Sequence, residues 1–493
     1  MFKRIFVVAL FFILLTAVLT FPLIMKITSF IPCFFSTDEV YGTIWDYWRV
    51  GYSIDHHLPI RYTHLICAPL GFNMFGTGTN YYLYWFAQNL LAKVISPIFS
   101  YNFQIFFNFV LSGVFTFLLT MRLRLRIPFS LFAGLIFAFC PYQFVRSWQH
   151  LSLTFNWLIV LCLLMIIILK EAPTRRNKTL FSLSIFLLFS FDYSIMYSTA
   201  IVLASFVIYS LWCSWREKIK VRDRLMVEGK FLLTVGGLVL LAMVVLLPQL
   251  IAIFKNLAVT PDVSYFVAHT YVKSFEDLFV QSARPLSYFF PVVVHPLFGK
   301  FTEQFVGSQL YGISFTEHTL YLGWTPLILA LVTFRRWRRN RKSLTSNHES
   351  RITDKESFYI GFFVFLVFVA WLFSQPPWWN IFGFKLYMPS FFMYKILPMF
   401  RAYCRFGIVV MLAVAVLAGF GLKFVLERFK SQKTKAAVSA LFCALVLFEF
   451  WNWPPYKVID LSKVPAVYYW IKEQPKDIVI ADYPLDADSP NEL

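Results

Sequence analysis

The sequence predicts an all-α polytopic membrane protein with about eleven transmembrane helices. It also predicts an interfacial helix in the first outer loop and the start of a small α/β outer domain at the C-terminus. Hydrophobic residues make up 59% of the 493 residues and charged residues only 14%, whereas a soluble domain has about 25% charged residues. Apolar runs of about 20 residues recur along the chain, with short clusters of Lys and Arg between them.

The N-terminal segment, MFKRIFVVALFFILLTAVLTFPLIM, is expected to be a retained first span. Lys3 and Arg4 precede about twenty apolar residues, a run that is longer than the apolar region of a secretory signal peptide. No A-x-A-like cleavage site follows this run. The basic residues predict that the N-terminus lies in the cytoplasm.

Apolar runs of roughly 17 to 25 residues predict the remaining spans. The segment 81–99 also has the length of a span, but counting it would put the basic cluster 122–126 on the outer side. We therefore expect 81–99 to be an interfacial or re-entrant helix on the outer face. The predicted spans are residues 4–25, 102–121, 128–145, 154–169, 179–194, 196–214, 231–254, 318–334, 357–374, 405–425 and 436–451.

The short basic clusters support this assignment, because Lys and Arg gather in cytoplasmic loops. An even number of predicted spans separates each cluster from the next, so all clusters fall on one side. The excess positive charge behind the net charge of +19 then lies in the cytoplasm. It is explained by topology and does not indicate nucleic-acid binding. The long loops 26–101, 255–317 and 375–404 are left on the outer side, which we expect to be the active face.

Residues 452–493 are expected to begin a separate extracytoplasmic domain. The stretch AVYYWIKEQ (466–474) has the pattern of a helix, and DIVIADYP (477–484) has that of a buried strand. The chain ends before such an α/β domain has enough residues to bury a core, as expected of a truncated domain.

The first outer loop carries acids that are candidates for chemistry. Its residues 38–53 have helical character. One face of this helix would carry Asp38, Tyr41, Trp45, Trp48 and Tyr52. Trp and Tyr favour the headgroup depth of a membrane, so we expect this helix to lie in the interface. On the residues alone, Asp38 at its start is equally a helix cap and a catalytic base that faces a cavity.

Asp46 is the second candidate base in this loop. Arg49 lies three residues further along the same helical face and would pair with Asp46, which favours a structural role for the carboxylate. Glu39, next to Asp38, is expected to be solvated.

Several stretches follow one another in a recognisable order. They are DEVYGTIWDYW (38–48), PLGFNMF (69–75), GLIFAFCPYQFVRSWQHLSL (134–153), DLFVQSARPLSYFFPVVVHPLFG (277–299), YLGWTPLILAL (321–331) and PMFRAYCRFGIVVMLAVAVLAGFGL (398–422). Each is weakly specific, but in this order they cover most of the chain, and the chain resembles the membrane-embedded GT-C glycosyltransferases, particularly bacterial members. Residues 1–451 would then be a GT-C-like transmembrane domain.

This resemblance implies transfer of a sugar from a polyprenyl-phosphate carrier to an acceptor on the outer face of the membrane. An acid in the first outer loop would activate the acceptor as a general base. The matching residue here is Asp38, with Asp46 as the second candidate. Such loops commonly carry a doublet of acids, and the nearest match is the DE at 38–39. The sequence does not distinguish a hexosyl from a pentosyl donor, nor does it name the acceptor.

Cations are needed to stabilise the charge of a phosphate leaving group, and two pairs at outer span ends are candidates. Arg401 and Arg405 lie four residues apart, as do Arg146 and His150, so each pair would share one helical face. Snorkelling to lipid headgroups is the alternative for each pair. Further candidates for the acceptor site or a secondary role are Asp192, Trp45, Trp48, Glu317 and His318.

A transporter or flippase of lipid-linked glycans is the main alternative, and a non-catalytic membrane scaffold is the second. A transporter should carry ionisable residues near the bilayer midplane, but here such residues cluster at one face. The resemblance implies a multi-pass protein of the bacterial inner (cytoplasmic) membrane, with the bilayer and a polyprenyl-phosphate-linked sugar as partners. No residues have the spacing of a metal cluster, but metal dependence varies in the family, so a divalent cation stays open.

Overall fold

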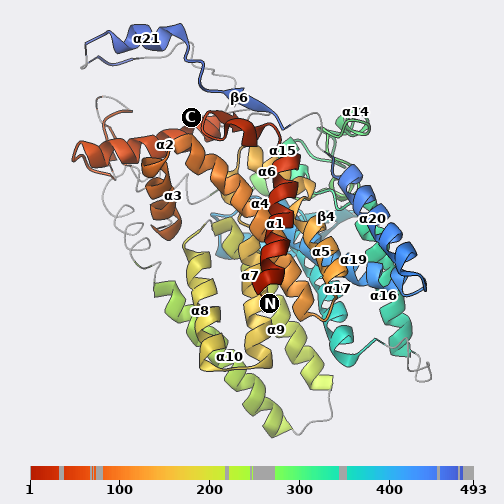
Figure 1. Cartoon of the computed structure of the whole chain (residues 1–493). Coiled ribbons are helices and arrows are strands. Elements are labelled where there is room, and N and C mark those ends of the chain that lie inside the picture. The colour runs from red at the N-terminus through yellow and green to blue at the C-terminus, as the bar shows by residue number, and fades with distance from the viewer. Residues whose placement is uncertain are drawn as a thin grey trace.

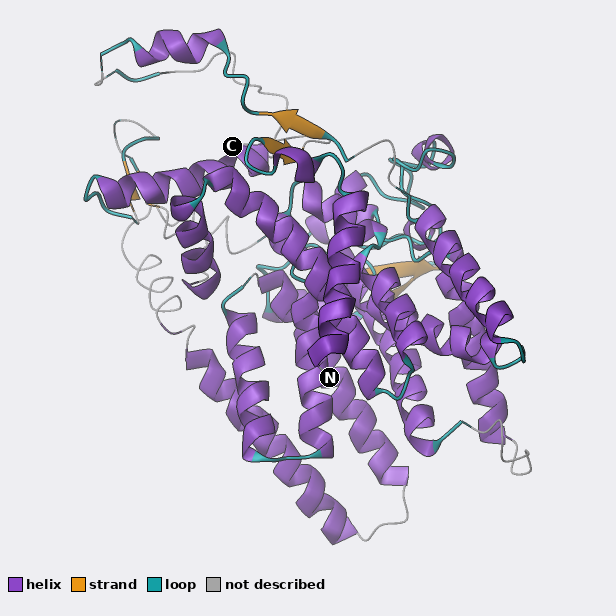
Figure 2. Cartoon of the chain, viewed as in Figure 1, coloured by secondary structure: helices purple, strands orange, loops and turns teal. Residues whose placement is uncertain are grey.

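The computed structural model of the chain is a bundle of helices with a few short strands (Figure 1 and Figure 2). It describes residues 2–32, 38–60, 62–66, 69, 71–73, 82–191, 193–216, 221–244, 247, 273–342, 352–451, 456–475 and 478–480. The α-helices are α1 (Phe2–Leu19), α2 (Asp38–Asp55), α3 (Tyr82–Val94), α4 (Pro97–Arg122), α5 (Ile127–Ala138), α6 (Pro141–Trp148), α7 (Trp157–Glu171), α8 (Arg175–Phe189), α9 (Tyr193–Arg216), α10 (Val221–Met243), α13 (Asp277–Val280), α14 (Gly299–Glu303), α15 (Phe315–His318), α16 (Trp324–Lys342), α17 (Asp354–Ser374), α18 (Pro389–Ile396), α19 (Gly407–Leu426), α20 (Gln432–Glu449) and α21 (Ala466–Lys472). The 3₁₀ turns are η1 (Leu23–Lys26), η3 (Leu151–Thr154), η5 (Leu286–Tyr288) and η7 (Tyr403–Phe406).

Helix α19 forms the centre of the bundle. Almost all of its residues are buried, because it packs against α16, α17, α5 and α20 at once. Its sequence, GIVVMLAVAVLAGFGLKFVL, is apolar all round, as expected of a helix with neighbours on every side. Helix α4 forms a second centre, with α1, α3, α5 and α7 packed around it.

Within the described residues, 5 helices are long and apolar enough to cross a membrane, or 6 if the bent pair α5 and α6 is one span. The five are Pro97–Arg122, Leu151–Glu171, Ser194–Arg216, Asp354–Ser374 and Tyr403–Leu426. These helices are those of a multi-pass membrane protein. The larger number of about eleven spans remains a prediction from the sequence.

The break between α5 and α6 places a polar helix against the core. The two helices are bent by 41°. Pro141 begins α6, and Cys140 before it has an extended backbone (φ −65°, ψ 152°). Proline lacks the N–H that would continue the α5 ladder, and it disfavours the helical region for the preceding residue. The predicted span 128–145 is therefore two helices, and α6 carries its side chains in a new direction.

Helices α2 and α3 pack against each other and against α4. Figure 1 shows α2 lying across one end of the bundle, where an interfacial helix is expected. The predicted helix at 38–53 is confirmed by α2 (Asp38–Asp55). Helix α3 has 13 residues and ends at Val94, well short of the roughly 20 residues that a span needs. This length agrees with a non-spanning role for the segment 81–99.

Each of the strands pairs with a single neighbour. Strand β1 (Phe30–Pro32) pairs antiparallel with β6 (Val458–Asp460). This pair links the segment after α1 to the segment before α21. Two hairpins are formed by β2 (Tyr62–Thr63) with β3 (Phe72–Asn73) and by β4 (Trp378–Ile381) with β5 (Phe384–Tyr387).

The C-terminal segment is described only in part. The helix predicted at 466–474 is present as α21 (Ala466–Lys472). Of the predicted strand 477–484, residues 478–480 are described, and they form no strand; the rest lies outside the described residues. The outer α/β domain therefore remains a prediction.

Gly421 allows the closest approach between α19 and α16. A Cβ added at Gly421 would overlap the backbone carbonyl of Leu329. We expect Gly421→Ala to lower the free energy of unfolding by about 1–3 kcal/mol, the usual cost of overpacking a core. The matched control is Gly237→Ala in α10, where no atom lies within 4 Å of the added Cβ. Thermal unfolding of both variants in detergent checks the prediction, and equal unfolding temperatures would contradict it.

His295 is held as a neutral imidazole. Its Nε2 donates to the carbonyl of Phe448 (2.9 Å), and its Nδ1 accepts from the backbone N–H groups of Leu297 and Phe298 (both 3.2 Å). Burial lowers the pKa of this His, although the Phe448 carbonyl opposes the shift. Protonation would replace the Nδ1 acceptor by a donor that faces two other donors.

Since the folded pKa of His295 lies below the unfolded one, its contribution to stability is complete above the unfolded pKa of about 6.5. The contribution is lost as the pH falls from there through the folded pKa. We expect the unfolding temperature to drop between pH 7.5 and pH 5.5, and to drop less in His295→Gln. The exposed His56 provides the control, because His56→Gln should keep the full drop. An identical pH dependence in His295→Gln and the parent would contradict the assignment.

Candidate functional site

One end of the bundle carries α2, α6 and α15 (Figure 1). The turn η7, which precedes α19, also lies here, because it contacts α15. Three side chains form the centre of this region: Arg146 from α6, Glu317 from α15 and Arg405 from η7. We call them the Arg146–Glu317–Arg405 cluster. They are far apart in the sequence, and α15 contacts both α6 and η7.

Arg146 is the inner arginine of the cluster. Its side chain is fully buried, and its Nη1 and Nη2 donate to the two oxygens of Glu317 at 3.2 and 2.6 Å. The guanidinium also lies over the ring of Tyr142, with 5.1 Å between its carbon and the ring centre. The two parallel hydrogen bonds are the strong bidentate form of an arginine–carboxylate pair. Because both Arg146 and Glu317 are buried, Arg146 does not extend to the lipid headgroups, which was the alternative role for this arginine.

Arg405 is the outer arginine. Its Nη2 lies 2.6 Å from Oε1 of Glu317, and its Nε lies 3.2 Å from both carboxylate oxygens. Its Nη1 donates to the hydroxyl of Ser194 (3.1 Å). The side chain is 20% exposed, whereas that of Arg146 is 0% exposed. Arg405 is therefore the more exposed of the two arginines of the cluster.

Glu317 holds the two arginines together. Its backbone N–H is capped by the hydroxyl of Ser314 (3.2 Å), which fixes the short helix α15. Burial opposes its charge, but Arg146 and Arg405 together hold the pKa of Glu317 well below its usual range. Two guanidinium groups and one carboxylate leave the cluster with one net positive charge. A buried group of this charge is suited to an anionic ligand.

The start of α2 lies beside this cluster. Glu39, in the first turn of α2, forms an ion pair with Nδ1 of His150. His150 also acts electrostatically on the carboxylate of Glu317. Glu39 is exposed, as expected, but it also contacts His150. Asp38 is the first residue of α2, but its side chain lies outside the described residues.

Neither Arg401 with Arg405 nor Arg146 with His150 lies on one continuous α-helix. The expectation that the members of each pair share a helical face is therefore wrong. Arg401 and Arg405 precede α19, which begins only at Gly407. The N–H of Cys404 donates to the carbonyl of Gln281 (3.0 Å), so this segment hydrogen-bonds to another loop and not along a helix. Arg401 consequently turns away from the cluster and pairs with Asp277 (2.9 Å).

The second pair differs for a similar reason. Helix α6 ends at Trp148, so His150 lies in the turn before η3 and not one helical turn beyond Arg146. The two residues therefore take different partners, Glu317 for Arg146 and Glu39 for His150. They still meet the same site, because His150 acts electrostatically on Glu317, the partner of Arg146.

Asp46 forms the predicted pair with Arg49. Its Oδ1 accepts from Nε (2.9 Å) and Nη2 (2.6 Å) of Arg49. The Arg49 side chain is 2% exposed and also donates to the carbonyl of Ile60 (2.8 Å). The pair therefore ties the middle of α2 to the loop that follows it.

The tryptophans of α2 contact other side chains of the same helix. Trp48 is 46% exposed and stacks on Tyr52, with 5.2 Å between the ring centres. Trp45 lies beside the guanidinium of Arg49 (5.9 Å). The contact between Trp48 and Tyr52 confirms that these two residues share a face. Neither tryptophan has a described contact with the cluster.

His318 and Asp192 complete the predicted residues. His318 is buried, with Nδ1 2.9 Å from the carbonyl of Ser314 and Nε2 3.1 Å from that of Ser282. It joins α15 to the neighbouring loop and so supports Glu317. Asp192 lies outside the described residues. Among those that are described, no group of three or more His, Cys, Asp or Glu has the arrangement of a metal site.

Sequence reasoning missed two participants of the site. Ser194 follows Asp192 in a segment that was singled out only for its acid, and nothing in its spacing points to Arg405. Cys404 lies with its Sγ 3.2 Å from Oε2 of Glu317. The position of Cys404 between Arg401 and Arg405 was the signal that could have identified it.

Comparisons with known proteins give two kinds of similarity. The chain matches the family described as "Domain of unknown function (DUF6311)" over residues 40–449. No curated protein matches it. The solved structure of the archaeal oligosaccharyltransferase AglB from Archaeoglobus fulgidus, in complex with an inhibitory peptide and a dolichol-phosphate, is similar with 13% identity and a TM-score of 0.49. This match covers 95% of the present chain and 58% of AglB.

The arabinofuranosyltransferase AftD from Mycobacteria is similar to the same degree, with 13% identity and a TM-score of 0.49. The match covers 95% of this chain but only 28% of AftD, so this chain spans a minor part of that protein.

Proposed function

From the premise that the chain belongs to the DUF6311 family, a domain of unknown function, we propose that it is a membrane-embedded glycosyltransferase. It transfers a sugar from a polyprenyl-phosphate carrier to a hydroxyl acceptor. The GT-C-like order of its motifs supports this reaction class. The observation that carries the proposal is the contact between the start of α2 and the Arg146–Glu317–Arg405 cluster, through Glu39 and His150.

We assign the general base to Asp38. A hydroxyl acceptor needs a carboxylate within hydrogen-bond reach to take its proton, and Asp38 begins α2 next to Glu39. The positive end of the α2 dipole favours an ionised carboxylate at that position. Glu39 keeps the start of α2 against His150. Asp46 remains the second candidate, although its bonds to Arg49 favour a structural role.

Arg405 is assigned to the phosphate of the donor. The bond between the sugar's anomeric carbon and the phosphate oxygen breaks, and its electron pair stays on the phosphate. The acceptor oxygen bonds to the anomeric carbon and gives its proton to the base. Arg405 is partly exposed and carries planar donors suited to a phosphate, while the buried Arg146 holds Glu317 in place.

The orientation of the protein is part of the proposal. The positive-inside pattern supports an N-terminus in the cytoplasm and an active end on the outer face of a bacterial inner membrane. The sugar and the acceptor are left open. A divalent cation is also left open.

The test is turnover by the purified protein in lipid. Labelled polyprenyl-phosphate sugars are supplied with candidate acceptors, and release of free polyprenyl phosphate is measured. We expect release by the wild type and by Asp354→Asn. Asp354 is the control because it lies in the first turn of α17, outside the first outer loop and outside the Arg146–Glu317–Arg405 cluster. We expect Arg405→Gln to lose most of this activity. If the folded wild type transfers no sugar but moves a lipid-linked glycan between leaflets, the flippase alternative is correct.

A further inference from the structure

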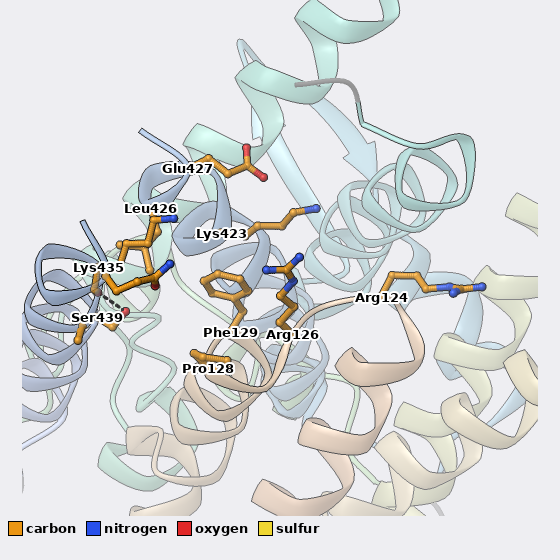
Figure 3. Close-up of a pocket in the computed structure, with 11 residues that line it drawn as sticks. Arg124, Arg126, Pro128, Phe129, Lys423, Leu426, Glu427, Lys435 and Ser439 are labelled. Carbon is orange, nitrogen blue, oxygen red and sulfur yellow. Dashed lines mark hydrogen bonds between the residues drawn. The ribbon is translucent and has the colours of Figure 1, made fainter. Parts of the chain in front are cut away.

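A second charged site lies away from the proposed active end. A cavity of about 800 Å³ is formed between the α4–α5 connection, the end of α19 and the start of α20. Its lining residues are Arg124, Arg126, Pro128, Phe129, Lys423, Leu426, Glu427, Gln432, Lys435, Ala436 and Ser439. Figure 3 shows most of them around Phe129. This volume is within the range of sites that bind small molecules.

The charge of this cavity is strongly positive. Its carboxylate, Glu427, is already paired with Arg336 (2.8 Å), which is not part of the lining. Lys423 pairs with Glu356 (2.5 Å). Arg124, Arg126 and Lys435 form no ion pair within the described part of the chain. Three cations therefore line the cavity without a neutralising carboxylate.

Helix geometry adds to this positive field. Helix α5 begins at Ile127 and α20 begins at Gln432, so both helices direct their N-terminal ends at the cavity. The partial positive charge of a helix N-terminus favours anions, and its backbone N–H groups suit phosphate oxygens. Arg126 occupies the N-cap position of α5. Its side chain is exposed, and it forms no ion pair within the described residues, so its guanidinium is available to a ligand.

The cavity also has an apolar side. Pro128, Phe129, Leu426 and Ala436 line it between the cationic groups. In Figure 3, Arg126 and Lys423 lie on one side of Phe129 and Lys435 on the other. A free phosphate would use the cations and leave this surface bare. A phosphate that carries a glycerol and acyl chains would use both.

We propose that this cavity binds the phosphate of an anionic phospholipid headgroup. It lies where the basic loops 122–126 and 427–435 meet, which the charge pattern predicts to be the cytoplasmic side. Basic pockets between helices on that side of a membrane protein suit such headgroups. The site is independent of the proposed glycosyl transfer, because none of its lining residues belongs to the Arg146–Glu317–Arg405 cluster.

Native mass spectrometry of the detergent-solubilised protein tests the proposal, with phosphatidylglycerol as the probe. The affected variant is Arg126→Gln with Lys435→Gln. The matched control is Arg338→Gln with Arg339→Gln, which removes the same charge from exposed positions of α16 that do not line the cavity. We expect the cavity variant to bind phosphatidylglycerol about tenfold more weakly than the wild type. The control should change by less than about threefold, because its charges are solvated.

Three results would overturn the proposal. Equal weakening in both variants would mean that general surface charge attracts the lipid. Binding of phosphatidylcholine as strong as that of phosphatidylglycerol would mean that the site does not recognise the net negative charge of the lipid. Displacement of the lipid by inorganic phosphate at a similar concentration would identify a soluble phosphate as the ligand. If the double variant does not fold, Lys435→Gln alone is compared with Arg338→Gln, and about a threefold weakening is expected.

Discussion

Replacing Glu317 by Gln is expected to lower the free energy of unfolding by about 3–5 kcal/mol, the usual cost of removing one partner from a buried ion pair. The carboxylate accepts from both Arg146 and Arg405, and the side chain of Arg146 is 0% exposed. An amide of the same shape would leave two guanidinium groups side by side without a counter-charge. Thermal unfolding and denaturant unfolding in detergent measure the loss.

The control for this variant is Glu303→Gln, which removes an exposed carboxylate at the end of α14. It should leave the unfolding temperature unchanged. A second variant, Glu317→Leu with Arg146→Met, removes the buried pair as a unit and leaves only the partly exposed Arg405. Because an apolar pair can replace a buried ion pair at little cost, this variant should recover much of the stability. Unchanged stability of Glu317→Gln would show that the cluster is not a structural unit.

Replacing the general base should lower turnover by about 10²–10⁴-fold without changing stability, since proton transfer by a positioned group contributes that much. On our assignment the variant with this effect is Asp38→Asn. Glu39→Gln should have a smaller effect, of about tenfold or less, because its ion pair with His150 is half-exposed and positions α2 only indirectly. Release of polyprenyl phosphate at saturating donor is the measurement.

Asp46→Asn distinguishes the second candidate base from the first. It would weaken the bonds that Asp46 makes to the buried Arg49, so we expect a lower unfolding temperature and only a small loss of turnover. A loss of turnover without a loss of stability would instead assign the base to Asp46. If Asp38→Asn, Glu39→Gln and Asp46→Asn all keep the turnover of the wild type, none of these three acids is the base.

Spacing along the sequence predicted contacts correctly where one helix carried both partners. The Asp46–Arg49 pair and the stacking of Trp48 on Tyr52 follow directly from positions three and four residues apart. The same argument was wrong for Arg401 and Arg405, because the segment before α19 hydrogen-bonds to the loop at Gln281 instead of forming a helix. Local spacing predicts a shared face only if the backbone is helical at both positions.

The sequence by itself determined that this is a multi-pass helical protein, since apolar length and the distribution of basic residues depend only on transfer from water to lipid. It also identified Glu317, Arg146 and Arg405 as candidates. Only the tertiary structure decided that these three form one buried cluster, and that Glu39 and His150 join it to the start of α2. The physical reason is that an ion pair is specified by distance in space, and the packing that brings α6, α15 and η7 together leaves no local pattern in the chain.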